Sequence, residues 1–238
     1  SITSIGNSAF ERCENLESIN IPAGVTKIKS YTFEECSSLK NITIPSKVTS
    51  IENSAFKGCS ALTSMQLPNS ITSIGKFAFC ECGNLETINI PTGITNIEDY
   101  TFKECSNLKS ITIPNRVTSI GSDAFYQCSA LTSIQLSNSI TSIGSFAFYR
   151  CYALTSMQLP NSITNIESGA FGSCENLESI NIPTNIMTIE DSTFAYCSKL
   201  NNITIPSKVT IIGKSAFNGC SALKSITIPE GVTTIGMS

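Results

Sequence analysis

The sequence contains no histidine and no tryptophan, and only 14% of its 238 residues are charged. Without histidine the chain lacks the commonest general base and the commonest metal ligand, so neither a Ser-His-Asp nor a Cys-His catalytic site can form within it. An average soluble protein has about 25% charged residues, so Ser, Thr, Asn and Gln must supply much of the polar surface here. We therefore expect a non-catalytic protein with no cofactor and no metal site.

Clusters of one charge sign and long apolar runs are also missing. The formal net charge is −3, and acidic and basic residues are interspersed along the chain. Nucleic acids and anionic lipids are bound by clustered Lys and Arg, and a membrane-spanning helix needs about 18 or more consecutive apolar residues. We therefore expect no nucleic-acid partner and no insertion of this segment into a membrane.

What the sequence does contain is one unit repeated many times. Ten of its eleven cysteines are spaced 23 residues apart, with Phe three residues before each and Leu three residues after each. One unit reads L-x-x-I-x-I-P-x-x-V-T-x-I-x-x-x-A-F-x-x-C, as in Leu39 to Cys59. Repetition at a period of 20 to 50 residues is typical of solenoids. The sequence therefore predicts a single domain over 1–238, cut in mid-repeat at both ends.

Each unit predicts one coil made of a strand, a turn, a second strand and a helical turn. Residues 18–21 alternate polar and apolar, the pattern of a strand with two Ile side chains buried and Ser and Asn exposed. Proline ends this strand in nine of ten units, with Ser137 as the exception. Residues 25–28 predict a second extended piece, and residues 8–13 are too short for more than one helical turn. We predict a β-rich, right-handed repeat solenoid of ten 23-residue coils, stabilised by stacking of neighbours.

This unit closely resembles the BspA-like leucine-rich repeats of bacterial and protist surface proteins, over nearly the whole chain. The resemblance implies a cell-surface or extracellular protein that attaches to other proteins, with extracellular matrix or plasma proteins such as fibronectin and fibrinogen as typical partners. The family motif consists of core and turn positions, so no catalytic or ligand-binding residue carries over. The predicted function is therefore adhesion or recognition without catalysis.

Two sets of side chains are candidate binding positions. The first lies in the stretch 117–166, where charges are sparse and aromatic residues and Arg, which are enriched in interface hot spots, come together. Because two of its tyrosines occupy one column of the repeat, we expect them to stack on neighbouring coils. The second set belongs to the uncharged outward column of the first strand. The candidates are Tyr126, Phe146, Tyr149, Arg150 and Tyr152 in the first set, and Gln135 and Gln158 in the second. Packing of the aromatic side chains against the next coil is the alternative interpretation.

The cysteines have a structural interpretation and several chemical ones. Those of the repeat stand between core residues, so we expect buried free thiols, while disulfides between stacked cysteines remain open. Cys80 lies outside the column and forms a Cys-x-Cys pair with Cys82, a weak metal motif without a second pair, and we expect it to be exposed. Asn41 and Asn202 begin Asn-x-Thr sequons, whose glycosylation requires a secretory route.

Two other functions remain open from the sequence. One is a structural spacer or self-assembling array, in which end-to-end self-association joins copies of the domain. The other is an intracellular scaffold for protein interactions, which fully reduced thiols and unmodified sequons would favour. Filaments that grow with protein concentration would favour the array over adhesion.

Overall fold

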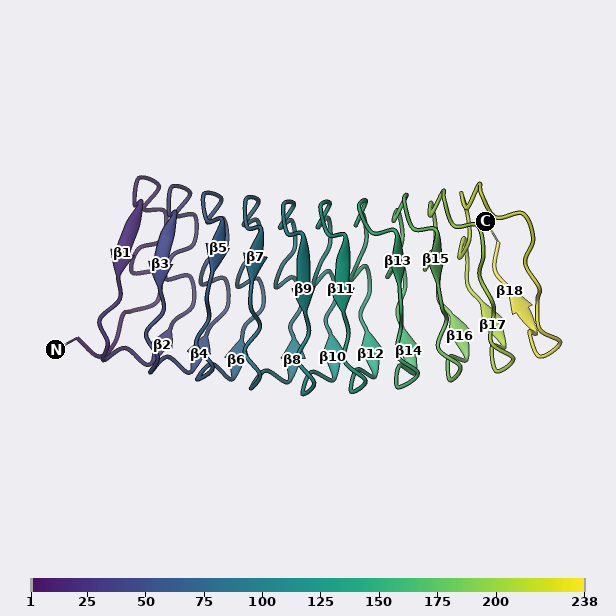
Figure 1. Ribbon diagram of the computed structural model, residues 1–238, viewed down its shortest axis with the longest axis horizontal. Helices are drawn as coiled ribbons and strands as arrows, with labels where there is room; N and C mark the ends of the chain where they lie inside the picture. Colours follow the sequence, from purple (N-terminus) through teal and green to yellow (C-terminus); the bar gives the residue numbers. More distant parts are fainter. Residues whose placement is uncertain (1, 238) are drawn as a thin grey trace.

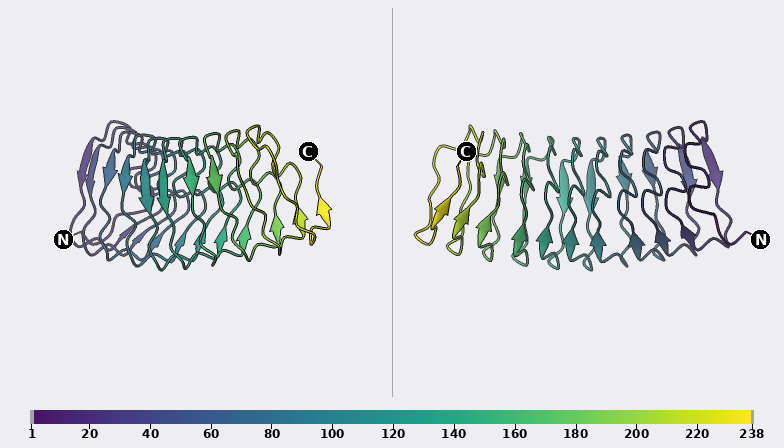
Figure 2. Two further views of the ribbon diagram at one scale, coloured as in Figure 1. Left: turned by 45° about the vertical axis from the view of Figure 1, so that its right-hand side comes forward. Right: turned by 180° about the vertical axis from the view of Figure 1, so that it is seen from behind.

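The computed structural model describes residues 2–237, which form one elongated parallel β-solenoid (Figure 1). The coils stack along one axis, the two chain ends lie at opposite ends of the stack, and two further views show the same arrangement (Figure 2). Paired strands run parallel and are 23 residues apart in sequence, as Ser18 is from Asn41 and Lys27 from Ser50. The predicted solenoid of 23-residue coils is confirmed.

The strands form two rows along the solenoid (Figure 1). The first row contains β1 (Ser18–Asn20), β3 (Asn41–Thr43), β5 (Ser64–Met65), β7 (Thr87–Ile88), β9 (Ser110–Thr112), β11 (Ser133–Gln135), β13 (Ser156–Met157) and β15 (Ser179–Ile180). The second row contains β2 (Lys27–Ile28), β4 (Ser50–Ile51), β6 (Ser73–Ile74), β8 (Asn96–Ile97), β10 (Ser119–Ile120), β12 (Ser142–Ile143), β14 (Asn165–Ile166), β16 (Thr188–Ile189), β17 (Ile211–Ile212) and β18 (Thr234–Ile235). First-row strands pair only two by two, whereas second-row strands form sheets of three or four. The first row is therefore interrupted after every second coil.

The alternating pattern predicted for the first strand is present. In β9, Ser110 and Thr112 are exposed while Ile111 between them is buried. The turn that follows is closed by a backbone hydrogen bond from Val117 N to the carbonyl oxygen of Pro114, at 3.0 Å. Where Ser137 replaces proline, the equivalent bond to its carbonyl oxygen also forms, at 3.3 Å. The first strand and its turn therefore depend on the column pattern and tolerate loss of the proline.

The third side of each coil does not contain the helical turn that the sequence predicts. No described residue is helical there, and two residues in every coil have positive φ, for example Tyr100 and Glu104, each at 60°. A helix requires negative φ throughout, and a non-glycine residue in the left-handed region costs roughly 1–2 kcal/mol. Their backbone N–H groups instead donate to the next coil, Tyr100 to the Ser122 carbonyl at 2.9 Å and Glu104 to the Tyr126 carbonyl at 2.8 Å. The helical prediction is wrong because every second N–H group of this segment donates to the next coil instead of to its own.

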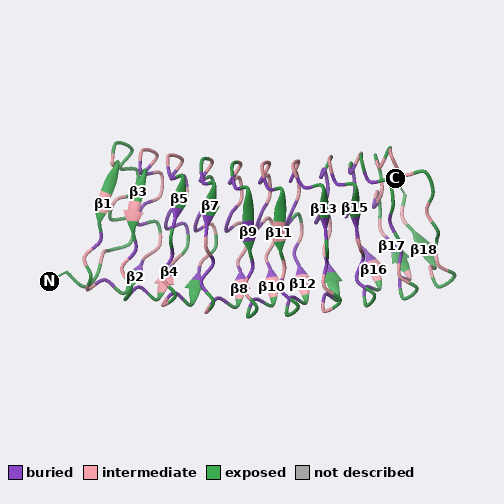
Figure 3. Cartoon of the chain, in the orientation of Figure 1, coloured by how far each residue is buried: buried purple, intermediate pink, exposed green. Residues whose placement is uncertain are grey.

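A continuous column of phenylalanine rings forms the centre of the core. From Phe10 to Phe217, consecutive rings stack with centroids 5.4–5.8 Å apart. The eight inner rings, from Phe33 to Phe194, are at most 1% exposed. Figure 3 shows buried residues in every inner coil along the stack, so one core runs through the solenoid.

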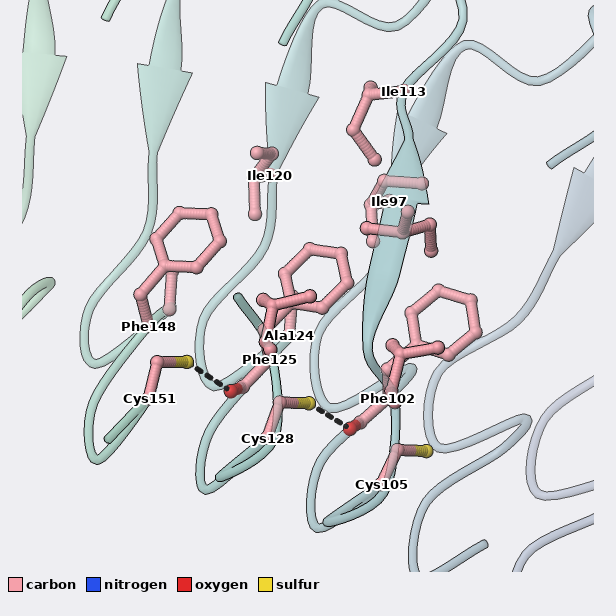
Figure 4. Packing of buried hydrophobic residues seen from close by; sticks show 14 of the residues in the cluster. Ile97, Phe102, Cys105, Ile113, Ile120, Ala124, Phe125, Cys128, Phe148 and Cys151 are labelled. Atoms are coloured by element: carbon pink, nitrogen blue, oxygen red, sulfur yellow. Dashed lines mark hydrogen bonds between the residues drawn. The ribbon is translucent and has the colours of Figure 1, made fainter. Parts of the chain in front are cut away.

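The cysteine of each coil is hydrogen-bonded to the coil before it. The Sγ atom of Cys128 donates to the Phe102 carbonyl oxygen at 3.2 Å, and that of Cys151 to the Phe125 carbonyl oxygen at 3.3 Å (Figure 4). Equivalent bonds extend from Cys36 to Cys220. All eleven cysteines are free thiols, as predicted. A column of cysteine therefore fills core space and also bonds to a backbone carbonyl.

Cys80 is buried, and the expectation of an exposed position is wrong. Its side chain is 1% exposed, and its Sγ lies 3.6 Å from a carboxylate oxygen of Glu81. Burial first, and the charge of Glu81 second, raise the pKa of the Cys80 thiol to about 12. The residues of the same column in the coils before and after are Lys57 and Lys103. The positive charges of these two lysines partly oppose the rise in the pKa of the Cys80 thiol.

Replacing Phe125 with alanine is expected to lower the free energy of unfolding by about 3–5 kcal/mol, because it removes a fully buried ring stacked on both faces. Phe10 is only half-buried and stacks on one neighbour, Phe33. Its replacement by alanine should cost clearly less. Urea denaturation followed by circular dichroism measures both values, and equal losses would contradict the central role of the ring column.

At pH 8 the folded protein is expected to react rapidly with a thiol reagent at Cys13 alone, because it is the one exposed cysteine. The thiolate is the reactive form, and burial raises the pKa of Cys36 and of Cys220 to about 11 and that of the inner column cysteines still further. Counting modified thiols by mass spectrometry should give one in native buffer and eleven in denaturant. Rapid native modification of several thiols would contradict this packing.

Candidate functional site

The residues with positive φ determine which side chains are exposed on the third side of each coil, which we call the turn side. They stand five residues and one residue before each repeat cysteine, as Phe146 (φ 55°) and Arg150 (φ 61°) do before Cys151. Phe146 is 39% exposed, and Tyr149 between the two is half-buried. Side chains in these columns therefore form the turn surface, whereas the Phe and Cys columns beside them remain in the core.

Aromatic and cationic side chains form a continuous strip on this surface over four successive coils. We call it the turn strip, and it consists of Phe77, Tyr100, Lys103, Tyr126, Phe146, Tyr149 and Arg150. Phe77 stacks on Tyr100 with ring centroids 4.3 Å apart, and Tyr126 stacks on Tyr149 at 5.4 Å. The Lys103 ammonium lies 5.6 Å from the Tyr100 centroid and 4.9 Å from that of Tyr126, so it joins the two aromatic pairs.

The end of the turn strip combines an edge-on ring with a guanidinium. Phe146 meets Tyr149 edge to face, with centroids 5.6 Å apart and an interplanar angle of 83°. The guanidinium carbon of Arg150 lies 5.4 Å from the Tyr149 centroid. Rings and cations in such contacts attract each other through the ring quadrupole, so these side chains hold one another in place.

Two glycines of the next coil make room for the rings. A Cβ atom added at Gly169 would clash with the Phe146 ring, and one added at Gly172 would lie 2.8 Å from the Tyr149 ring. Part of each ring therefore packs on the following coil, as the alternative interpretation held. Phe146 nevertheless keeps an exposed face, so the turn strip is both packed and open to solvent.

The two cations of the turn strip differ in their surroundings. Lys103 lies 3.9 Å from a carboxylate oxygen of Glu104 in the same coil. Arg150 belongs to none of the ion pairs among the residues that the structure describes. Charge interactions with nearby tyrosines, Tyr126 first and Tyr152 second, raise the pKa of the Arg150 guanidinium. Its charge is therefore available to pair with a carboxylate of a partner.

The structure brings most of the first candidate set together. The predicted stacking of Tyr126 on Tyr149 is confirmed, and Phe146 and Arg150 contact the same ring. Tyr152 is half-buried and adjacent, and its backbone N–H donates to the Arg150 carbonyl at 2.9 Å. Whether these residues bind a partner stays a prediction.

Sequence reasoning missed three members of the turn strip, Phe77, Tyr100 and Lys103. A signal for them was present, since Phe77 and Tyr100 share the column of Phe146, and Lys103 shares that of Tyr126. Reading these columns along the chain, rather than the charge-poor stretch alone, would have found them. That stretch starts at residue 117, after all three.

Gln135 and Gln158 lie apart from the turn strip, in open hollows along the first row of strands. Gln158 lines a hollow of about 340 Å³ beside Asn181. Gln135 lines one of about 580 Å³ together with Arg116 and Ser137. No residue of the turn strip lines either hollow. The two candidate sets therefore belong to two separate surfaces.

Residues 2–237 also bear on metal binding, membrane insertion and glycosylation. Over this range no three Cys, Asp or Glu side chains gather in a way that could hold a metal ion. The same range contains no helix with the length and hydrophobicity needed to cross a membrane. Asn41 and Asn202, which begin the two sequons, are both exposed, so each is accessible to modification.

Comparison with known proteins gives a family and several related structures. Residues 3–132 and 118–238 match the family described as BspA type leucine-rich repeat region. A leucine-rich repeat protein from Bacteroides ovatus is similar, with a TM-score of 0.79 and 26% identity over 99% of this chain and 78% of its own. A comparison with curated protein sequences finds no match.

Two further solved structures resemble this chain. A leucine rich cell surface protein from Faecalibacterium prausnitzii has a TM-score of 0.59 and 37% identity over 85% of this chain and 63% of its own, so this chain spans less than two thirds of that protein. A leucine rich repeat protein from T. pallidum has a TM-score of 0.58 and 27% identity over 88% of this chain and 78% of its own. Because the family match extends over nearly every coil described above, this chain belongs to the BspA-type leucine-rich repeat family.

Proposed function

We propose that this chain is a non-catalytic recognition module at the cell surface or outside the cell, and that it attaches to host matrix or plasma proteins through the turn strip. The observation that carries the proposal is the continuous contact of Tyr100, Lys103, Tyr126 and Tyr149 along the solenoid. Tyr and Arg are the residue types most enriched where interfaces gain their binding energy. Leucine-rich repeat domains generally bind proteins, which agrees with this use of the surface.

The rigidity of the turn strip supports a role in binding. Its rings are held by stacking, as Tyr126 is on Tyr149, and the Tyr149 ring also packs on Gly172 of the next coil. Side chains already ordered in the free protein lose little conformational entropy on association. The guanidinium of Arg150, which forms no ion pair with the residues that the structure describes, adds a directional contact for a carboxylate. A partner with acidic residues next to apolar ones fits this combination.

Two observations support the proposed location. A relative that is 37% identical is described as a cell surface protein, and this chain has a surface of Ser, Thr, Asn and Gln with few charges. The open hollows lined by Gln135 and Gln158 do not bring several ionisable groups together, which supports a surface for recognition rather than for reaction.

An intracellular protein-interaction scaffold is the second candidate function. The observation in its favour is that all eleven cysteines are free, as is usual in reducing compartments. Nine of them are buried, however, and burial protects a thiol from oxidation wherever the protein resides. Surface labelling of intact cells that produce the full-length protein separates the two candidates, because a scaffold inside the cell would remain unlabelled.

Replacing Tyr126, Tyr149, Arg150 and Tyr152 together with alanine is expected to weaken binding to fibronectin or fibrinogen by about 30-fold or more. Loss of one hot-spot side chain costs about 2 kcal/mol or more, and every 1.4 kcal/mol is tenfold in affinity, so a single hot spot among the four residues suffices for this loss. Surface plasmon resonance with the immobilised plasma proteins measures the change. Arg150→Gln alone should weaken binding less, since it keeps the rings.

The matched control replaces Tyr31 and Tyr196, which are 43% and 54% exposed and lie outside the turn strip. Its affinity should equal that of the unchanged protein. Thermal denaturation confirms that each variant is folded. If the strip variant binds as well as the control, the turn strip is not the binding surface, and if the unchanged protein binds neither plasma protein, the proposed partner class is wrong.

A further inference from the structure

Two hollows on the first row of strands are copies of one another. The first, of about 420 Å³, has a rim of Gln66, Thr87, Asn89, Thr92, Ser110 and Thr112. The second, of about 340 Å³, has a rim of Gln158, Ser179, Asn181, Thr184, Asn202 and Thr204. Each member of the first rim has its counterpart 92 residues, or four coils, later. We call these surfaces the twin hollows.

One asparagine side chain in each twin hollow explains where that hollow lies along the solenoid. The side-chain amide of Asn89 accepts a hydrogen bond from Leu67 N at 2.7 Å and donates one to the Leu67 carbonyl oxygen at 2.9 Å. Asn181 makes the same two bonds to Leu159, at 2.7 and 2.8 Å. Each asparagine thus bonds to the backbone of the preceding coil, on the side away from the following one.

The first row of strands is interrupted on the other side of each asparagine. β7 and β9 belong to different sheets, and β15 is joined to the coil after it only by an isolated bridge between Ser179 and Asn202. The twin hollows lie at these two interruptions, since residues of β7 and β9 line the first and residues of β15 line the second. The same recess therefore forms at both places where an Asn side chain bonds to the preceding coil and the strand row is interrupted after it.

The lining of the twin hollows is neutral and suits a ligand with hydroxyl groups. No ionisable side chain lines either hollow, and each rim consists of amide and hydroxyl side chains over three isoleucines and one proline. Amides and hydroxyls can both donate and accept hydrogen bonds, as sugar hydroxyls require. The apolar floor can contact the C–H groups of a sugar ring. A charged ligand would find no partner here.

We propose that the twin hollows bind a linear neutral glycan, and that one glycan chain occupies both. Coils in such a stack are about 4.8 Å apart, so the hollows lie about 19 Å from each other. A polymer long enough to span that distance would gain avidity from two-point binding. This site is separate from the turn strip and does not depend on the function proposed for it.

A glycan fits the twin hollows better than a peptide does. A peptide strand typically adds to the exposed edge of a sheet and gains affinity from backbone hydrogen bonds. The first-row strands have other coils at their edges along the stack, so the hollows present outward side chains such as Thr87 and Ser110. Binding through side-chain hydroxyls and amides is the mode that remains.

The test uses the whole chain made in a bacterial host, so that Asn202 in the second hollow is not glycosylated. Isothermal titration calorimetry is carried out with neutral trisaccharides of glucose, mannose, xylose and galactose, which are too short to reach from one hollow to the other. At least one of them should bind with two sites per chain. Thr87→Arg, in the first hollow, and Ser179→Arg, in the second, should each leave one site, and the double variant none. The corresponding long polysaccharide should bind each single variant about 100-fold more weakly.

Ser64→Arg is the matched control, because Ser64 is exposed in the same column, one coil before Thr87, and lines neither hollow. It should keep two sites, and circular dichroism verifies that all variants are folded. The proposal is overturned if none of the trisaccharides binds, or if the double variant retains its sites. Binding of a neutral Asn- and Thr-rich peptide with the same loss of sites, in place of the sugars, would also overturn the glycan assignment.

Discussion

Every coil of this chain needs the coils on either side of it to cover the two faces of its phenylalanine ring. Inside the stack, rings follow one another at 5.4–5.8 Å, and the thiol of each coil bonds to the carbonyl of the Phe in the coil before. No single coil could bury these groups, so the energy of the fold lies in the interfaces between neighbours. The constant columns of the sequence are the residues of those interfaces.

The same dependence on neighbours explains the unusual backbone of the turn side. Two residues in each coil have positive φ, and most of them are not glycine. This conformation costs energy at each non-glycine position, and the N–H groups of these residues recover it by bonding to carbonyls of the next coil. The backbone is thus the same in every coil while the side chains at these positions vary from Ser to Tyr and Phe. A repeat with a constant core can therefore carry different surface chemistry in each coil.

The two surfaces of this chain arise from such local variation. The turn strip forms where aromatic residues recur in the same column of neighbouring coils, as Tyr126 and Tyr149 do. At its end the Tyr149 ring packs on Gly172 of the next coil. The twin hollows form where an Asn side chain bonds backward to the preceding coil, as Asn89 does to Leu67. One surface is aromatic and cationic, and the other is neutral and polar. They can serve different ligands on one rigid support.

The sequence by itself determined the 23-residue coil, the buried columns and the alternating first strand, because a residue that recurs at a constant interval must find the same environment in each coil. It also predicted the stack of Tyr126 on Tyr149, which share a column. Only the tertiary structure decided the left-handed turns, the burial of Cys80 and the backward bonds of Asn89. These features depend on hydrogen bonds and packing with the adjacent coil, 22 or 23 residues away. The repeat spacing tells which residues are neighbours in that coil, but it does not tell how each of them bonds or packs.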